Sequence, residues 1–403
     1  MSGTGRDRDA APGLAGEGAV EGAVEGALAP WLARGGPILL AVSGGPDSTA
    51  LMHAAAAGAG RAGPALHVAT VDHGLRPDSA AEAEAVARGA AGLGLPHHRL
   101  RWEGPHPATG LQAAAREARY RLLAACAGGI DAGLLLTGHT RDDQAETVLM
   151  RLLAGSGPAG LAGMRAERPL GPGLILARPF LGLPKAALVA WCRARGLATL
   201  RDPSNADPRF GRARLRALMP ALAREGLSAA RLVRLAERAA RDEAALGAAA
   251  AQALAAALRE EAPGRLGLDG AEVAALPDAV ALRLLDRALD RAGGAGPRRL
   301  ERLERLALEA LLPALRAGRP LRRTLRGLLI EARPDGGLSL RPAPRRGGPR
   351  PGSDPHGRHG AGDAGLLGKG EPTTYIGPEC DDDPTAAGKG PGAGLAHSPR
   401  MDR

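Results

Sequence analysis

The chain has 403 residues and a formal net charge of +10, and only three of its 53 basic residues are lysines. This length predicts two or three domains. The arginine excess favours a nucleic-acid partner, although a GC-rich genome that encodes arginine in place of lysine explains the composition equally well. Cys126, Cys192 and Cys380 form no CxxC motif, which argues against a zinc cage or a disulfide framework and fits a reducing cytoplasm. Neither a signal peptide nor a run of about 20 apolar residues is present, so we expect a soluble protein without membrane contact.

The chain begins with a segment rich in glycine, alanine and charged residues, which predicts a disordered or loosely helical leader over residues 1–29. Short apolar runs then alternate with helical stretches as far as residue 179. Strands are expected at 37–43, 65–72, 96–102, 132–138 and 174–178, and helices near 48–58, 79–92, 111–127 and 142–154. This alternation predicts an α/β domain over residues 30–218, with a parallel Rossmann-like sheet and helices on both of its faces.

A glycine-rich turn joins the first expected strand to the first expected helix. Its residues are Ser43, Gly44, Gly45, Pro46, Asp47 and Ser48. Adjacent glycines permit a tight turn, and the free N–H groups at a helix start favour an anion, so the turn predicts a phosphate cradle. The serine hydroxyls add donors, and Asp47 could hold a cation that accompanies a polyphosphate. The pattern GxxxxGK[ST] of the common P-loop is absent, and the three lysines, at 185, 369 and 389, are far from this turn along the chain.

A second polar segment, residues 137–147, follows the expected strand at 132–138. Asp143 and Glu146 are three residues apart, which places them on one face in the first turns of a helix, and Asp142 is the expected N-cap. One explanation of such a carboxylate pair is purely structural: it caps the helix and balances the helix dipole. Because ligands bind at the carboxyl ends of parallel strands, however, we expect it on the same rim as the phosphate cradle and as Asp72 and His73.

The second half of the chain predicts a smaller helical domain over residues 219–341. It is rich in leucine, alanine, arginine and glutamate from 211 to about 317, and residues 319–341 are expected to form a closing hairpin. The low-complexity tail, 342–403, is expected to be disordered. Four arginines follow 3, 4 and 3 spacing and form either an RNA-binding stripe or a solvated charged face: Arg231, Arg234, Arg238 and Arg241.

The SGGPDS turn resembles the pyrophosphate loop of the N-type ATP pyrophosphatases, which cleave ATP between its α and β phosphates to adenylate a substrate. Further blocks resemble the tRNA(Ile)-lysidine synthetases within that superfamily. These blocks, in that family's order, are residues 71–76, 111–120, 137–147, 151–164, 178–181 and 202–220. The position of a second histidine in that family's HHxDD motif is Thr140 here, which leaves any role of that side chain open.

The resemblance implies the ATP-dependent attachment of free L-lysine to C2 of the wobble cytidine in the CAU anticodon of tRNA(Ile), which changes codon reading from AUG to AUA. ATP would first adenylate O2 of the cytosine, and the lysine amine would then displace AMP. Asp47 is the expected Mg²⁺ ligand, and Asp143 and Glu146 are the expected partners of the lysine ammonium groups. The catalytic set further includes Arg212.

Arginines that are expected to hold a phosphate or the lysine carboxylate are Arg116, Arg119 and Arg216. The sequence does not decide between Arg116 and Arg119. The alternative for this pair, and for the pair Arg212 and Arg216, is a solvated arginine face of a helix. We expect the low-complexity tail to stand where longer family members have a second C-terminal domain, and tRNA selection therefore to rest on the helical domain. The sequence does not determine the oligomeric state, and a homodimer is one possibility. Another adenylating enzyme, such as a tRNA thiolase, and a non-catalytic RNA-binding protein are the alternatives.

Overall fold

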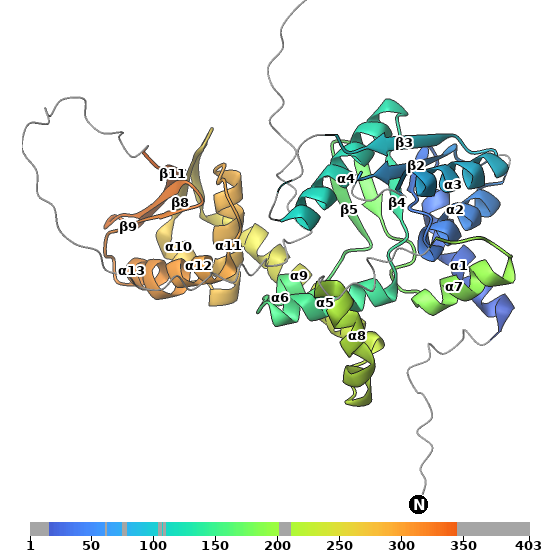
Figure 1. The fold of residues 1–403 in the computed structure, drawn as a ribbon. Helices are drawn as coiled ribbons and strands as arrows, with labels where there is room; N and C mark the ends of the chain where they lie inside the picture. The colour runs from blue at the N-terminus through green and yellow to red at the C-terminus, as the bar shows by residue number, and fades with distance from the viewer. Residues whose placement is uncertain are drawn as a thin grey trace, which may run out of the picture. The chain divides into compact units, whose positions relative to one another are not determined.

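A computed structural model describes residues 16–60, 63–74, 79–103, 107, 110–200 and 211–344. These residues form two compact units (Figure 1). The first contains the described residues up to 155 together with 160–237, and the second contains 156–159 and 238–344. The division falls inside a helix at 237/238, so the segment 219–237, expected in the second domain, packs with the first.

The first unit is built on a six-stranded sheet in the order β3-β2-β1-β4-β6-β5. All neighbours are parallel except the edge pair β5–β6. The strands are β1 (Ile38–Ala41), β2 (Leu66–Asp72), β3 (His97–Arg101), β4 (Leu134–Thr137), β5 (Glu167–Gly171) and β6 (Leu174–Ala177). The helices are α1 (Glu17–Leu32), α2 (Pro46–Ala59), α3 (Ser79–Gly92), α4 (Leu111–Gly129), α5 (Arg141–Leu153), α6 (Pro158–Leu161), α7 (Lys185–Ala194), α8 (Gly211–Arg224) and α9 (Ala229–Ala257), the last of which continues into the second unit.

Side chains alternate between the two faces of β1 and enter two separate cores. Ile38, Leu40 and Val42 pack with α1, α2, α3 and α7, whereas Leu39 and Ala41 pack with α4 on the opposite face. Figure 1 shows α4 on one side of this sheet and α1, α2 and α7 on the other. The expectation of a mostly parallel sheet with helices on both faces is therefore confirmed.

The edge strand β5 was not expected from the sequence. It contains Pro169, and its pairing with β6 is irregular between Pro169 and Gly171. Proline cannot donate a ladder hydrogen bond, so it is tolerated at an edge but makes the segment read as a loop.

Residues 17–29 of the leader, predicted as disordered or loosely helical, belong to the packed helix α1. Its Val24, Leu28 and Leu32 are buried against the core of the first unit. These positions are four residues apart and therefore form one face of the helix. The glycines between them lower helix propensity, and the packing of this face outweighs that preference.

The second unit contains a sheet that the expectation of a helical domain missed. Its strand order is β7-β8-β11-β10-β9, and all four pairings are antiparallel. The strands are β7 (Leu258–Ala262), β8 (Arg265–Asp269), β9 (Leu321–Leu325), β10 (Leu328–Ala332) and β11 (Gly337–Pro342). The helices are α10 (Gly270–Ala274), α11 (Asp278–Arg291), α12 (Leu300–Glu304), the π-helix η2 (Arg305–Leu311) and α13 (Leu312–Arg316).

The hairpin expected within 319–341 is present as β10–β11. The hairpin β7–β8 was read as helix because β7 has the sequence Leu-Arg-Glu-Glu-Ala, whose residues all favour helices. Leu266 and Leu268 of β8 alternate into the core of this unit, and that burial requires the strand pairing.

Several expectations fall outside the described residues. They concern the leader over 1–15, residues 75 and 76 of one family-like block, residues 202–210 of another, and the tail from 345 onward, which contains Cys380. Among the helices in the described ranges, none has the length and apolar character needed to cross a membrane.

The packing of α1 gives a first prediction. Leu28→Ala should lower the free energy of unfolding by about 2–5 kcal/mol, because Leu28 is 1% exposed and the shorter side chain leaves a cavity in the core. Glu25→Ala changes an exposed residue of the same helix and should have little effect. Chemical denaturation of the full chain measures both, and equal stabilities would show that α1 is not part of the folded unit.

Candidate active site

The sheet order places three strand exits side by side. The chain runs from β1 outward to β2 and β3, and then returns to the other side of β1 with β4. The crevice between β1 and β4 is therefore the topological switch point, where open α/β sheets bind ligands. The SGGPDS turn follows β1, Asp72 ends β2, and the segment from His139 onward follows β4, so all three lie on one rim.

The two loops at the switch point touch each other. A Cβ atom added to Gly138 would lie 2.9 Å from the carbonyl oxygen of Asp47 and 3.1 Å from the backbone nitrogen of Ser48. Only a residue without a side chain permits this approach. The phosphate cradle and the acidic start of α5 are therefore parts of one site.

The SGGPDS turn is braced by its own hydroxyl groups. The Ser48 hydroxyl donates to the carbonyl of Gly45 and accepts from the backbone N–H of Ser43, both at 3.1 Å. Thr49 donates to the carbonyl of Gly44, whose φ of +84° favours glycine. Pro46 opens α2, so the first turn of that helix presents its N–H groups to the rim.

Lys185 enters the site from α7 and was missed by the sequence reasoning. Its ammonium lies 2.8 Å from Oδ2 of Asp47, and its backbone N–H donates to Asp142 at 2.7 Å. It supplies the lysine that the phosphate loop lacks in sequence, from a position 138 residues away. Pro184, which precedes the helix, was its only local signal, and a single helix-opening proline does not indicate a ligand.

One oxygen of the Asp47 carboxylate accepts no hydrogen bond from the residues that the structure describes. This oxygen, Oδ1, is buried, whereas Oδ2 bonds Lys185. Burial raises the pKa of Asp47 above its ordinary value, and the ion pair with Lys185 offsets part of this effect. A buried, unsatisfied carboxylate oxygen beside a phosphate loop suits a divalent cation.

The start of α5 corrects the predicted N-cap. Thr140 caps this helix, and Asp143 completes a capping box, since its Oδ2 accepts the backbone N–H and the hydroxyl of Thr140 at 2.8 Å each. Asp142 instead holds the first N–H of α7. The threonine that replaces a histidine of the family pattern therefore has a structural role, and one Asp143 oxygen is committed to the helix cap.

Glu146 forms a two-pronged ion pair with Arg216 of α8. Nε of Arg216 donates to Oε1 at 2.7 Å, and Nη2 donates to Oε2 at 2.9 Å. The Glu146 side chain is 4% exposed and that of Arg216 is 38% exposed. The hydrogen bond to Glu146 raises the pKa of Arg216, although burial opposes this effect. The structure thus brings together two predicted site residues as partners of each other.

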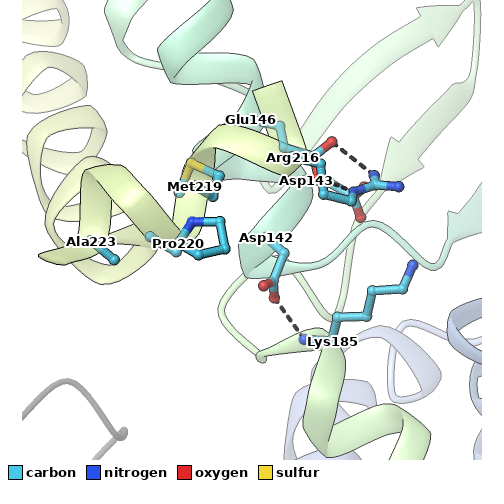
Figure 2. A pocket seen from close by; sticks show the side chains of 9 residues that line it. Asp142, Asp143, Glu146, Lys185, Arg216, Met219, Pro220 and Ala223 are labelled. Carbon is cyan, nitrogen blue, oxygen red and sulfur yellow. Dashed lines mark hydrogen bonds and ion pairs between the residues drawn. The ribbon is translucent and has the colours of Figure 1, made fainter. Parts of the chain in front are cut away.

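These groups line a cavity of about 300 Å³ between α5, α7 and α8 (Figure 2). Three carboxylates and two cations face it: Asp142, Asp143, Glu146, Lys185 and Arg216. The α8 wall continues with Met219, Pro220 and Ala223, which lie with Arg216 at helical spacing. An acidic pocket with an apolar wall suits a cationic group on an aliphatic stem.

The charges of several arginines act on His139, the residue after Gly138. Burial and the positive charges of Arg178, Arg119, Arg116 and Arg212 hold the pKa of His139 well below its ordinary value. The imidazole is therefore neutral, and its Nδ1 bonds the Thr137 hydroxyl at 2.9 Å. Four guanidinium charges that act on one rim position suit an anion such as a phosphate or a carboxylate.

The structure distinguishes the two arginines that the sequence left equivalent. Arg116 lies over the Tyr120 ring, with 5.2 Å between its guanidinium carbon and the ring centroid. Burial lowers the pKa of Arg119, and the charge of Arg116 adds to this effect. Both side chains are half-buried, so the feature that separates them is the tyrosine ring beside Arg116, and both stay candidates for an anion clamp.

The Asp72 carboxylate shapes its own loop. It accepts the backbone N–H of Gly74 at 2.9 Å and Nη2 of Arg99 at 3.0 Å. Burial alone would raise the pKa of Asp72, but hydrogen bonds from Ser79, Gly74 and Arg99 lower it to about 2. His73 packs edge-on against Trp102, with ring centroids 6.1 Å apart. Asp72 and His73, which the sequence predicts on the rim of the phosphate cradle, therefore lie in an ordered turn at the exit of β2.

The cysteines in the described part of the chain are poor nucleophiles. Burial and the charge of Asp47 raise the pKa of Cys192 to about 11, and its thiol donates to the carbonyl of Pro46. Burial also raises the pKa of Cys126. Sulfur transfer requires a thiolate, and neither side chain offers one near neutral pH.

Residues 23–222 match the PP-loop domain family, so the rim belongs to an ATP-using PP-loop domain. The tRNA(Ile)-lysidine synthase of Methylobacterium nodulans is 60% identical over 323 residues, which cover 78% of this chain and 94% of that protein. Its counterpart in Rhodopseudomonas palustris is 52% identical over 321 residues, with coverage of 77% and 92%. That of Salinispora tropica is 47% identical over 285 residues, with coverage of 70% and 84%. The chain belongs to the tRNA(Ile)-lysidine synthase family.

The contact at Gly138 gives a second prediction. Gly138→Ala should lower ATP-dependent turnover at least tenfold, because the added methyl group meets backbone atoms of Asp47 and Ser48 that cannot move independently of the cradle. Gly128→Ala adds the same group in open space on α4 and is the matched control. Normal turnover of the Gly138 variant would show that the two loops need not touch.

Proposed function

We propose that this protein attaches free L-lysine to C2 of the wobble cytidine in the CAU anticodon of tRNA(Ile), with ATP as the energy source, and so changes codon reading from AUG to AUA. The observation that carries the proposal is the contact between the phosphate cradle and the acidic pocket at one switch point. Family membership supports the same reaction. An anion-binding cradle beside an acidic pocket calls for two ligands of opposite charge, and a nucleotide next to an amine supplies them.

In the first step, O2 of the cytosine attacks the α-phosphate and pyrophosphate leaves. Backbone N–H groups of Gly44 and Gly45 and the first turn of α2 would stabilise the departing charge. Lys185 is 2.8 Å from Asp47 and can exchange that carboxylate for a phosphate oxygen. Arg119 and Arg212, which lie near His139, would hold the α-phosphate or the lysine carboxylate.

Mg²⁺ would be held by Asp47, whose buried Oδ1 accepts no hydrogen bond from the described residues. The described part of the chain offers no cluster of three metal-ligating side chains. The ion would therefore rest on one carboxylate together with phosphate oxygens and water, as Mg²⁺ often does at nucleotides. When bound, it would neutralise negative charge on the phosphates.

In the second step, the ε-amine of lysine attacks C2 and AMP leaves with the former O2. Lysine carries two ammonium groups, and Asp143 and Glu146 supply the carboxylates of the pocket that would receive it. Met219, Pro220 and Ala223 would cover its aliphatic stem. The ammonium must lose a proton before attack, to a carboxylate or to water.

The second unit offers a surface for the tRNA body. A groove of about 710 Å³ is lined by α12, η2 and the β9–β10 turn. Its Arg302, Arg305 and Arg323 are exposed, and within the described residues none of them forms an ion pair, while Glu309 is its one acidic lining residue. Guanidinium groups without carboxylate partners suit RNA phosphates. The arginines from Arg231 to Arg241 are also exposed on α9 and offer further guanidinium groups for RNA phosphates.

The proposed setting is the cytoplasm, where lysine, ATP and tRNA meet, and a homodimer is compatible with the proposal. A tRNA thiolase is the other adenylating enzyme to weigh, and the raised thiol pKa values of Cys126 and Cys192 speak against it. A non-catalytic RNA-binding protein would not need Asp47, Lys185 and the pocket carboxylates together at one rim.

The proposal is tested by incubating the protein with tRNA(Ile), ATP and labelled lysine. Lysine should enter the tRNA, with AMP and pyrophosphate formed in equal amounts. Asp143→Asn should lower incorporation by about two orders of magnitude, because it removes a negative charge from the pocket. Asp131→Asn makes the same change at an exposed residue and should not. Pyrophosphate release with another nucleophile would indicate the thiolase, and no ATP consumption would indicate the RNA-binding protein.

The groove gives a further prediction. Arg302→Glu combined with Arg305→Glu should weaken binding of full-length tRNA at least tenfold and reduce its salt dependence, because phosphate contacts are lost. The control, Arg265→Glu combined with Arg319→Glu, has the same charge change at exposed positions outside the groove. Equal losses of affinity in both double variants would show that overall charge, and not the groove, determines tRNA binding.

A further inference from the structure

The carboxylate expected to bind the substrate amine is already occupied by the protein. Both oxygens of Glu146 accept hydrogen bonds from Arg216, at 2.7 and 2.9 Å, and Figure 2 shows this pair on the wall of the acidic cavity. The Glu146 side chain is 4% exposed. A carboxylate this deeply buried is strongly destabilised without a cation, so some positive group must always face it.

Arg216 belongs to a wall that is held only loosely. No residue of α8 is buried, and the helix contacts α5 through the partly buried Leu215, Met219 and Leu222. The Arg216 side chain is 38% exposed, so solvent reaches the arginine from which it would be displaced. The same face of α8, from Arg216 to Ala223, forms the apolar wall of the cavity. Withdrawal of Arg216 would therefore both free Glu146 and widen the pocket.

We propose that Arg216 is the resident counter-ion of the amino-acid pocket, and that an ammonium group of lysine binds by displacing it from Glu146. This inference rests on the proposed function, and it assigns Arg216 a role different from that of a phosphate or carboxylate clamp. The exchange keeps Glu146 paired in both states. Arg216 competes with the substrate, so the measured affinity for lysine is lower than the affinity of the vacated pocket.

Competition by an internal cation also contributes to selectivity. To displace Arg216, a ligand must bind the pocket with a more favourable free energy than the two hydrogen bonds of the guanidinium provide. A molecule that fills the rest of the cavity gains this free energy from further contacts with Asp143 and the α8 wall. Small amines lack that gain. Arg216 thus sets a threshold that excludes ligands able to satisfy Glu146 alone.

The test is the steady-state kinetics of lysine incorporation by the full chain with tRNA(Ile) and ATP. Arg216→Gln should lower the KM for lysine about tenfold, because the competing cation is gone. Methylguanidinium should become a competitive inhibitor against lysine in this variant and have little effect on the wild-type protein, in which Arg216 fills its place. Arg216→Met keeps the aliphatic stem, and it should shift KM in the same direction if the glutamine variant folds poorly.

Arg224→Gln is the matched control, because it removes an exposed arginine from the same helix outside the cavity lining. A KM for lysine that rises or stays unchanged in both Arg216 variants would overturn the proposal. An increase in the KM for ATP or tRNA instead would make Arg216 a phosphate clamp. If the wild-type protein incorporates no lysine, the proposed function fails, which is a different outcome from normal incorporation with an unchanged KM.

Discussion

The parallel pairing of β1 with β4 is the constraint on which the site depends. It aligns Ala41 with Thr137, so the two strands end together and their loops must share one crevice. The glycine at 138 then allows the acidic segment to lie directly against the phosphate cradle. A different strand order would have left two unconnected half-sites, each with an ordinary structural explanation as a turn or as a helix cap.

Charge balance within the crevice is achieved by the protein's own cations. Lys185 faces Asp47, and Arg216 faces Glu146, where the proposed chemistry calls for Mg²⁺ and a substrate ammonium. Buried carboxylates are costly without partners, so a site built to attract cations must hold substitutes when empty. The same carboxylates also have structural bonds, since Asp142 holds the start of α7 and Asp143 caps α5. Binding groups and folding groups therefore coincide in this pocket.

The arginine-rich composition has several separate uses. Arg326 and Arg298 form ion pairs with Asp286 and Asp290 inside the second unit, and Arg151 donates to the carbonyls of Gly160 and Gly163 in the first. Others act on His139 through their charge or line the groove of the second unit. Net charge alone therefore does not identify an RNA-binding surface, and the arrangement of partners around each guanidinium is more informative.

Sequence patterns alone predict five of the six strands of the first unit, its helices α2 to α5, the phosphate loop and the acidic segment, because apolar periodicity and glycine-rich turns are local signals. They miss the edge strand β5, whose proline makes it read as a loop, and the packing of α1. They could not determine the contribution of Lys185, the pairing of Glu146 with Arg216 or the capping role of Thr140, because those depend on which elements meet. The β7–β8 hairpin was hidden for a related reason. Its residues favour a helix locally, and only burial of Leu266 and Leu268 against distant strands makes the extended form more stable.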